Sequence, residues 1–185
     1  MDQPEVTLRG QLLLSSPAMF DPNFRRTVLL VTEHSPEGAM GVVLNRPSSV
    51  SVADAVPNLA RLAGDDALVH VGGPVQPEAV VALAELDDPS EAAAVAFGSV
   101  GYLRADVDPA SFEGGVRRIR VFAGYSGWAA GQLDGEMEEG AWIVEEATAD
   151  DVFCAVPEEL WATVLTRKGG RYRLLATMPA DPTAN

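Results

Sequence analysis

The stretch T-V-L-L-V-T-E-H-S-P-E-G-A-M-G-V-V-L-N, residues 27–45, decides the fold class. Its first six residues form a continuous apolar and β-branched run, a pattern typical of a strand that is buried on both faces. Ser35-Pro36-Glu37-Gly38 has the composition of a turn, and residues 40–44 are apolar again. The stretch therefore predicts an antiparallel β-hairpin.

Further strands are predicted on both sides of this hairpin. The first should end at the turn residues Ser15-Ser16-Pro17, and Asp21-Pro22-Asn23 forms a second turn. Periodicity does not decide whether residues 79–86 form a strand or a short helix. Strands or extended segments are expected over 5–14, 67–71, 93–100, 117–123 and 141–144.

Helices are predicted from their capping residues. Ser49 or Ser51 should cap a helix over 52–62, and Thr148 is a further N-cap. A helix over 128–139 follows the turn at 124–127, and a last helix runs from Pro157 through Thr166 and ends at Gly169. Strands that dominate the first half and helices that interleave in the second predict an α+β (mixed α/β) fold with a largely antiparallel sheet.

Length and composition indicate one domain over residues 1–185, with flexible ends at 1–6 and 179–185. The chain is 47% hydrophobic and 22% charged, which is typical of a globular protein. Cys154 is the only cysteine, so neither an internal disulfide nor a cysteine-based zinc site is expected. The acidic N-terminus and the interrupted apolar runs argue against a signal peptide and a membrane span, which predicts a cytoplasmic protein.

The net charge of −14 argues against direct nucleic-acid or membrane-surface binding, because nonspecific affinity for either comes from Lys and Arg. One alternative remains open, in which seven basic residues form a local DNA-binding patch. These residues are Arg117, Arg118, Arg120, Arg167, Lys168, Arg171 and Arg173.

Several stretches together resemble the YqgE/AlgH family of bacterial proteins. They are L-L-S-S-P-A-M at 13–19, D-P-N-F-R-R-T-V at 21–28, E-H at 33–34, G-A-M-G-V-V-L-N-R-P at 38–47, G-G-P-V at 72–75, G-Y-S-G-W at 124–128, G-Q-L at 131–133, Glu136, Trp142 and Trp161. Their order and spacing agree across nearly the whole chain. The chain departs from the family at Pro179-Ala180-Asp181-Pro182, where a more glycine-rich tail is usual.

The resemblance implies a compact fold with a bifurcated, partly barrel-like sheet surrounded by helices. It implies no reaction and no cofactor. One branch of the family carries the label of a transcriptional regulator of alginate synthesis, and the family as a whole is of uncharacterised function. The same stretches nominate candidate residues for one ligand cavity, which are Asp21, Arg25, Asn45, Arg46, Gly73, Tyr125 and Trp128.

Gly124-Tyr125-Ser126-Gly127 lies between a predicted strand and a predicted helix, as a nucleophile elbow would. Trp128 occupies the place of the second glycine, and both histidines lie upstream of the serine, so the hydrolase motif is incomplete. We favour a tight packing turn here, with Trp128 in the core. Anion binding at the start of the following helix is a third interpretation.

The remaining polar residues have structural explanations as well as functional ones. Arg46 could hold a carboxylate or phosphate, but a partner within the fold, Asp21 or Glu33, is favoured. His34 and His70 lack the spacing of metal ligands, so a structural role is expected for each and no metal site is predicted. Cys154, among apolar neighbours, is expected to be a core thiol.

The segment 134–159 carries ten acidic residues and no Lys or Arg. It forms either a solvated face or a surface for a basic protein partner. The sequence therefore favours a non-enzymatic binding or regulatory protein that acts through a protein partner or a small ligand, with no catalytic residue assigned. The alternative is an enzyme of unrecognised type, such as a small-molecule hydrolase that uses residues 124–128.

Overall fold

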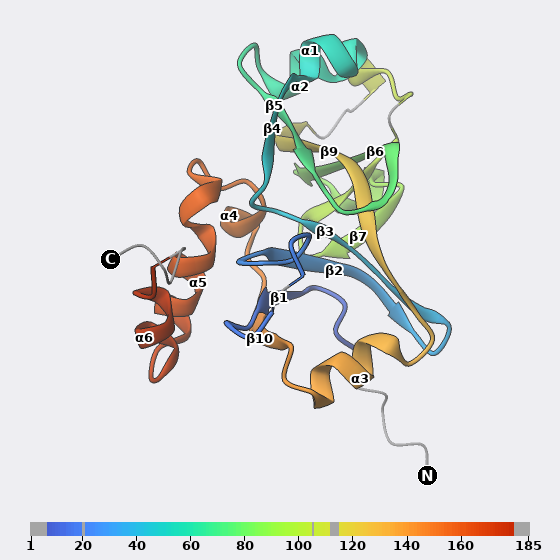
Figure 1. Cartoon of the computed structure of the whole chain (residues 1–185). Coiled ribbons are helices and arrows are strands. Elements are labelled where there is room, and N and C mark those ends of the chain that lie inside the picture. Colours follow the sequence, from blue (N-terminus) through green and yellow to red (C-terminus); the bar gives the residue numbers. More distant parts are fainter. Residues whose placement is uncertain (1–6, 20, 105, 112–114, 180–185) are drawn as a thin grey trace.

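The computed structural model describes residues 7–19, 21–104, 106–111 and 115–179. The ends that the sequence predicts to be flexible, 1–6 and 179–185, lie outside the described residues apart from Pro179. Figure 1 shows the described residues as one body, in which a twisted sheet carries helices at both ends and along one side.

Ten strands form one open sheet in the order β10-β1-β2-β3-β9-β6-β8-β7, and β4 and β5 attach to it through β9. Every strand pairing is antiparallel except that of β5 with β9, which confirms the predicted α+β fold with a largely antiparallel sheet. The strands are β1 (Gln11–Ser15), β2 (Val28–Ser35), β3 (Gly38–Val43), β4 (Pro47–Ser51), β5 (Leu68–Val71), β6 (Val75–Leu86), β7 (Ala94–Phe97), β8 (Val100–Leu103), β9 (Val116–Ala129) and β10 (Trp142–Glu146).

The long strand β9 is the branch point of the sheet (Figure 1). One of its edges pairs with β6 from Val116 to Tyr125. The other edge pairs with β5 at Phe122 and Ala123, and then with β3 from Ser126 to Ala129. The sheet is therefore bifurcated, as the family resemblance implies, and it is not closed.

The helices cover the two faces and the ends of this sheet. In Figure 1, α1 and α2 lie over β4 and β5 at one end, α3 lies at the opposite end, and α4–α6 lie along one side. None of the helices in the described part of the chain is long and apolar enough to cross a membrane. They are α1 (Val52–Ala55), α2 (Ala60–Ala63), α3 (Gln132–Glu138), α4 (Ala149–Val152), α5 (Leu160–Lys168) and α6 (Tyr172–Ala176), with 3-10 turns at η1 (Pro57–Leu59), η2 (Pro89–Glu91), η3 (Pro109–Ser111) and η4 (Pro157–Glu159).

The predicted hairpin over 27–45 is confirmed as β2 and β3. In β2, Val28 and Leu30 join the core beneath α4 and α5, while Leu29 and Val31 join a second core that contains Trp128 and adjoins α3. Both faces of the strand are thus buried, which explains its continuous apolar run. A third core lies under α1 and α2.

Two local predictions differ from the structure in informative ways, one open choice is resolved, and one strand was not predicted. The helix expected over 52–62 begins after the predicted cap Ser51 but is interrupted at Val56-Pro57, because proline cannot donate within a helix. The strand expected over 93–100 is instead a hairpin, β7–β8, that turns near Gly98. Residues 79–86 belong to β6, and strand β4 was not predicted.

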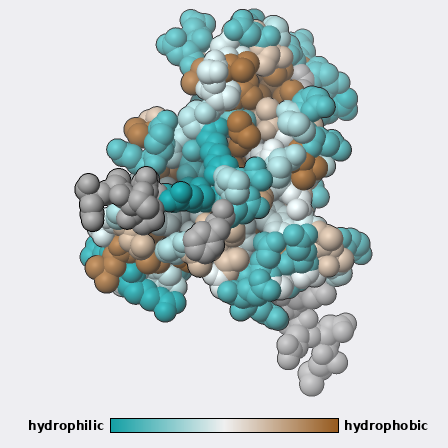
Figure 2. Space-filling view, in the orientation of Figure 1, coloured by the Kyte–Doolittle hydropathy of each residue, from teal (hydrophilic) through white to brown (hydrophobic). Residues whose placement is uncertain are grey.

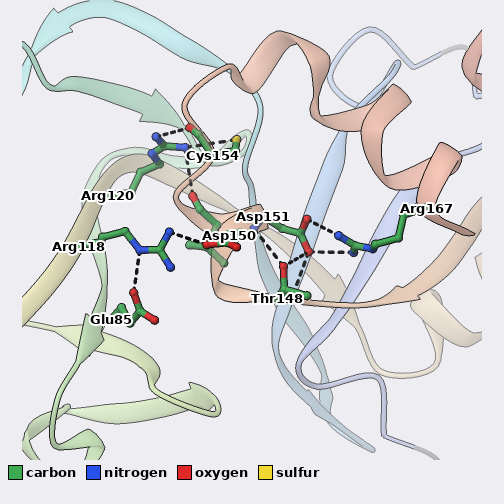
Figure 3. A network of polar contacts seen from close by, with 9 residues as sticks. Glu85, Arg118, Arg120, Thr148, Asp150, Asp151, Cys154 and Arg167 are labelled. Carbon is green, nitrogen blue, oxygen red and sulfur yellow. Dashed lines mark hydrogen bonds and ion pairs between the residues drawn. The ribbon is translucent and has the colours of Figure 1, made fainter.

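The acidic helix α4 joins the branch strand to the C-terminal helices (Figure 3). Arg118 on β9 pairs with Glu85 at 2.7 Å and with Asp150 at 2.8 Å. Asp151 is buried, completes a capping box with Thr148, and accepts two hydrogen bonds from Arg167 on α5 at 2.8 and 2.9 Å. This network holds α5 against the sheet and gives the predicted N-cap Thr148 its role.

Candidate functional site

The segment 124–128 is neither an elbow nor a turn, because β9 continues through it to Ala129. Gly124 has the left-handed φ of +71° that such a turn needs, but β6 bulges opposite it and the ladder resumes. Ser126 is fully buried and its hydroxyl donates to the carbonyl of Gly72 at 3.3 Å. The predicted helix over 128–139 therefore begins only at Gln132, and the strand-turn-helix geometry of a nucleophile elbow is absent.

The glycines of this region bring two backbones together and line no cleft between them. A Cβ on Gly72 would lie 2.3 Å from the carbonyl oxygen of Gly124, and one on Gly73 would lie 2.3 Å from the backbone of Tyr125. The loop after β5 thus lies directly against β9, which only residues without a side chain permit. In the described part of the chain, these close contacts leave no space for a ligand between the two backbones.

Asn45 and Arg46 hold the loop before β2 in place. The Asn45 amide donates to the carbonyl of Arg26 and accepts from the amide of Val28, each at 2.9 Å. The Arg46 guanidinium donates to the carbonyls of Asn23, Pro22 and Arg25 at 2.5, 3.0 and 3.1 Å. Burial lowers the pKa of Arg46, and the nearby carboxylate of Asp21 opposes that shift. Arg46 therefore has an internal role, with the backbone of this loop as its partner.

Trp128 belongs to an aromatic cluster at the α3 end of the sheet. Its indole N–H and that of Trp142 both donate to Glu136 Oε2, at 3.0 and 2.8 Å. The two indoles meet edge to face, and Phe24 meets Trp142 in the same way. Glu136 thus satisfies two donors that burial would otherwise leave unpaired.

The seven candidate residues lie in several different surroundings. Arg46 and Gly73 line a small cavity of about 60 Å³ together with Asn23, and Arg25 lines a different one. The side chain of Tyr125 packs on the central core, and Asp21 accepts from the amide of Asn23 at 2.9 Å in its own loop.

The two histidines have separate surroundings. His34 Nδ1 accepts from the amide of Leu8 at 3.0 Å, and its Nε2 lies 3.7 Å from the carboxylate of Asp134. His70 is buried and its Nδ1 lies 3.2 Å from the carbonyl of Leu68. Within the described ranges, no group of three or more His, Cys, Asp or Glu side chains is arranged to hold a metal ion. Cys154 is partly buried on the central core, where burial raises the pKa of its thiol.

The acidic segment 134–159 does not form one uniform face. Glu136, Asp150 and Asp151 make the contacts described above, and Glu145 Oε2 lies 3.5 Å from Lys168 Nζ. The exposed carboxylates that remain are divided between different elements. They are Asp134, Glu138, Glu139, Glu146, Glu158 and Glu159.

Most of the basic residues of the alternative DNA-binding patch have internal partners. Arg117 pairs with Asp87, and Arg120 donates to the carbonyls of Val152 and Cys154 at 3.1 and 2.8 Å. Arg118 and Arg167 are held in the α4 network (Figure 3). These contacts neutralise or occupy the cations that a DNA backbone would need.

A groove around Ser16 and Pro17 is the strongest candidate site. Two cavities, of about 470 and 80 Å³, share these two residues. Four of the thirteen Lys and Arg side chains of the chain line them, and none of the described lining residues is acidic. The larger cavity is lined by Ser16, Pro17, Gly140, Trp142, Ile143, Val144, Lys168, Arg171, Tyr172 and Leu175, and the smaller by Ser16, Pro17, Met19, Arg25, Arg26, Trp161, Met178 and Pro179.

The walls of the Ser16 groove combine aromatic rings with cations. Arg26 lies over the Trp161 ring at 4.7 Å, while Lys168 and Arg171 both lie 5.1 Å from the Tyr172 ring. The Ser16 hydroxyl is buried and has no hydrogen-bond partner among the described residues. Next to the groove, Leu174 is 73% exposed, and Figure 2 shows hydrophobic atoms on the surface of this C-terminal region. These features suit a ligand that is both anionic and partly apolar.

Several residues of the Ser16 groove belong to stretches that the sequence marks for other reasons. Residues 13–19 and Trp161 were singled out as family stretches, and Lys168 and Arg171 as members of a DNA-binding patch. The missing step was the contact between the turn after β1 and the C-terminal helices, where the Trp161 indole donates to the carbonyl of Ser15 at 3.1 Å. Those residues lie 146 positions apart, beyond the reach of any local pattern.

Comparison with known proteins places the chain in a family. The model of the AlgH-like family matches residues 12–173. The chain belongs to the AlgH-like family. A UPF0301 protein of Thermobifida fusca is 41% identical, over 97% of this chain and 96% of its own length, and one of Streptomyces coelicolor is 40% identical with the same coverage.

Two solved structures share the fold. A crystal structure of a Corynebacterium diphtheriae protein superimposes with a TM-score of 0.86 at 28% identity, covering 96% of this chain and 95% of the other. The solution structure of the AlgH protein from Pseudomonas aeruginosa gives a TM-score of 0.70 at 30% identity, covering 97% and 98%. The predicted relationship to the YqgE/AlgH family is therefore confirmed, and the family is one of uncharacterised function.

Proposed function

We propose that this AlgH-like protein is a non-catalytic binding protein whose Ser16 groove holds an acidic, partly apolar segment of a partner protein. One observation carries the proposal: a chain with 27 acidic and 13 basic residues lines this groove with four cations and, among the residues that the structure describes, no carboxylate. In so acidic a molecule, a locally cationic groove favours an anionic ligand over a basic one.

Apolar surface in and beside the groove favours a peptide over an inorganic anion. Trp161, Leu175 and Met178 line its two cavities, and Leu174 is exposed beside them. Aromatic and aliphatic side chains of this kind anchor peptide ligands, while the cations at the rim provide selectivity.

The partner would bind through its side chains and not by adding a strand. β10 forms the end of the sheet, and an open strand edge would be a template for pairing. Here Lys168 donates to the carbonyl of Val144 at 2.8 Å, and Arg167 donates to that of Glu146 at 3.2 Å. These bonds occupy the edge and leave the groove beside it for side-chain recognition.

Binding of a partner protein in the Ser16 groove would also account for a regulatory role. A cytoplasmic AlgH-like protein of net charge −14 would influence transcription indirectly, through a protein partner, because its own field repels DNA. A serine hydrolase at 124–128 has no comparable support, since Ser126 is buried in a strand.

The test uses a matched pair of charge reversals, one at the residue that precedes α6 and one within that helix. Arg171→Glu reverses a cation at the groove, while Arg173→Glu makes the same change on an exposed residue of that helix outside the lining. Wild type and both variants are applied to an array of 15-residue peptides that varies acidic, basic and apolar content. We expect wild type and Arg173→Glu to retain acidic peptides containing Leu or Phe, with affinity that falls as salt rises, and Arg171→Glu to lose them at least about fivefold.

Three outcomes would contradict the proposal. The array could retain no peptide, or mainly basic peptides, or the two variants could give the same profile. Circular dichroism of both variants establishes that they are folded before the comparison is made.

A further inference from the structure

A cavity lies at the branch of the sheet, where residues of β5 and β9, together with Val52 of α1 and Ala63 of α2, line it. β5 and β9 run parallel but pair only at His70–Phe122 and Val71–Ala123. Where the two strands separate, a cavity of about 200 Å³ lies between them, lined by Leu68 and His70 on one strand and by Ile119, Arg120 and Val121 on the other. Its volume equals that of roughly six or seven water molecules in the liquid.

His70 lines this cavity and carries an unsatisfied acceptor. The residue is 5% exposed, and its Nδ1 lies 3.2 Å from the carbonyl of Leu68. A carbonyl only accepts, so Nδ1 carries the hydrogen and Nε2 carries the lone pair. Nε2 is buried and has no hydrogen-bond partner in the described part of the chain. Burial, followed by the charge of Arg120, lowers the pKa of His70 to about 4, so the ring is neutral near pH 7.

Arg120, which lines the same cavity, retains donors for an anion. Its Nη1 donates to the carbonyl of Val152, and its Nη2 donates to that of Cys154 (Figure 3). Nη1 also lies 3.7 Å from the sulfur of Cys154. A guanidinium has five N–H groups, and the contacts described leave Nε–H and one Nη2–H, which form the side-on pair that binds a carboxylate in two bonds.

We propose that this branch cavity binds a small hydroxycarboxylate, with its carboxylate on Arg120 and its hydroxyl donating to His70 Nε2. A ligand of about six non-hydrogen atoms matches the volume. A metal ion is disfavoured at Nε2 because the guanidinium carries a positive charge beside it. A simple carboxylate would satisfy Arg120 alone and leave the buried imidazole nitrogen unpaired.

Two pairs of compounds and two variants test this site. Lactate and glycolate carry the hydroxyl, whereas propionate and acetate are their counterparts without it. Asn at position 70 keeps a donor near Nδ1 for the Leu68 carbonyl and removes the Nε2 acceptor, so His70→Asn preserves the structural bond. His34→Asn changes the other histidine and is the matched control. Binding is followed at pH 7 by nitrogen-15 NMR of the imidazole and guanidinium groups, with each compound added up to 50 mM.

We expect lactate or glycolate to shift the signals of His70 Nε2 and Arg120 Nε, and to bind about tenfold more tightly than the counterpart without the hydroxyl. His70→Asn should abolish that preference, and His34→Asn should retain it. The proposal is overturned if neither hydroxy acid shifts these two signals, which is the result expected of a cavity that holds water only. It is also overturned if both members of a pair bind equally to the wild type. Neither outcome bears on the Ser16 groove, whose residues are different.

Discussion

The imidazole of His70 resists protonation in the folded protein more than in the unfolded chain, because burial and Arg120 lower its pKa from 6.5 to about 4. Between these two values the unfolded state binds a proton that the folded state does not. The contribution of His70 to stability is therefore complete above about pH 6.5, falls as the pH drops, and is fully lost near pH 4. A difference of this size amounts to roughly 3 kcal/mol over the whole interval.

This predicts that His70 makes the protein acid-sensitive. Urea unfolding at pH 7 and pH 5 should show a loss of about 2 kcal/mol in the wild type that is missing from His70→Asn. The carboxylates titrate in both proteins, so their effect cancels in the comparison. An equal loss in the wild type and in His70→Asn would show that the ring is accessible to protons in the fold.

At the scale of single elements, β9 needs a glycine at position 124 for two reasons. Its backbone has a left-handed φ there, and neighbouring backbone atoms leave no space for a side chain. Gly124 and Gly131 share a φ of +71°, but a Cβ on Gly124 would lie 2.6 Å from the carbonyl oxygen of Gly73, whereas nothing lies within 4 Å of one on Gly131. Alanine is strained at both positions but meets steric overlap only at position 124. Comparing the two substitutions therefore separates the cost of backbone strain from the cost of steric overlap.

We predict that Gly131→Ala costs about 1 kcal/mol of unfolding free energy, from strain alone. Gly124→Ala should cost more than about 3 kcal/mol or prevent folding, since β9 would have to move away from the loop after β5 and from the start of β6. Urea unfolding followed by tryptophan fluorescence measures both. Equal and small costs at the two positions would mean that the loop after β5 and the start of β6 move aside for a methyl group.

The β2–β3 hairpin and the segment 124–127 show when a local sequence pattern is enough to predict an element. The β2–β3 hairpin was predicted because its apolar run, its turn and its second run lie within 19 residues. The turn at 124–127 was wrongly predicted, since Gly124 does adopt a left-handed φ but β6 bulges to accommodate it, and β6 lies some 45 residues earlier in the chain. The residue type indicates which backbone angles are accessible at a position. Whether the chain turns there or continues as a strand depends on the strand that pairs with it.

At the scale of the whole molecule, the same limit governs the candidate site. An internal role is the favoured interpretation of Arg46, but its hydrogen-bond partners are backbone carbonyls of the loop and not the predicted carboxylates, because a charge-pairing argument does not identify backbone acceptors. The Ser16 groove needed the C-terminal helices to be placed against β1 and β10. No local rule supplies that placement, because it results from Trp161 and Leu165 entering the central core.

The net charge of −14 has a consequence for the molecule as a whole. Exposed carboxylates on α3 and η4 repel one another and the rest of the surface, and this repulsion is present in the compact state more than in the expanded one. Salt screens it with a Debye length of about 8 Å at physiological ionic strength. We therefore predict that the melting temperature rises by several degrees between about 10 and 200 mM NaCl.

A variant with four exposed carboxylates neutralised provides the control for this effect. Glu138, Glu139, Glu158 and Glu159, each changed to Gln, should melt at a higher temperature than the wild type at low salt and respond less to added NaCl. The internal pairs Asp151–Arg167 and Arg118–Glu85 act in the opposite sense, because salt weakens them, although burial of Asp151 and Glu85 limits that loss. A melting temperature that falls with NaCl in both proteins would mean that these pairs, and not surface repulsion, dominate the electrostatic free energy of the fold.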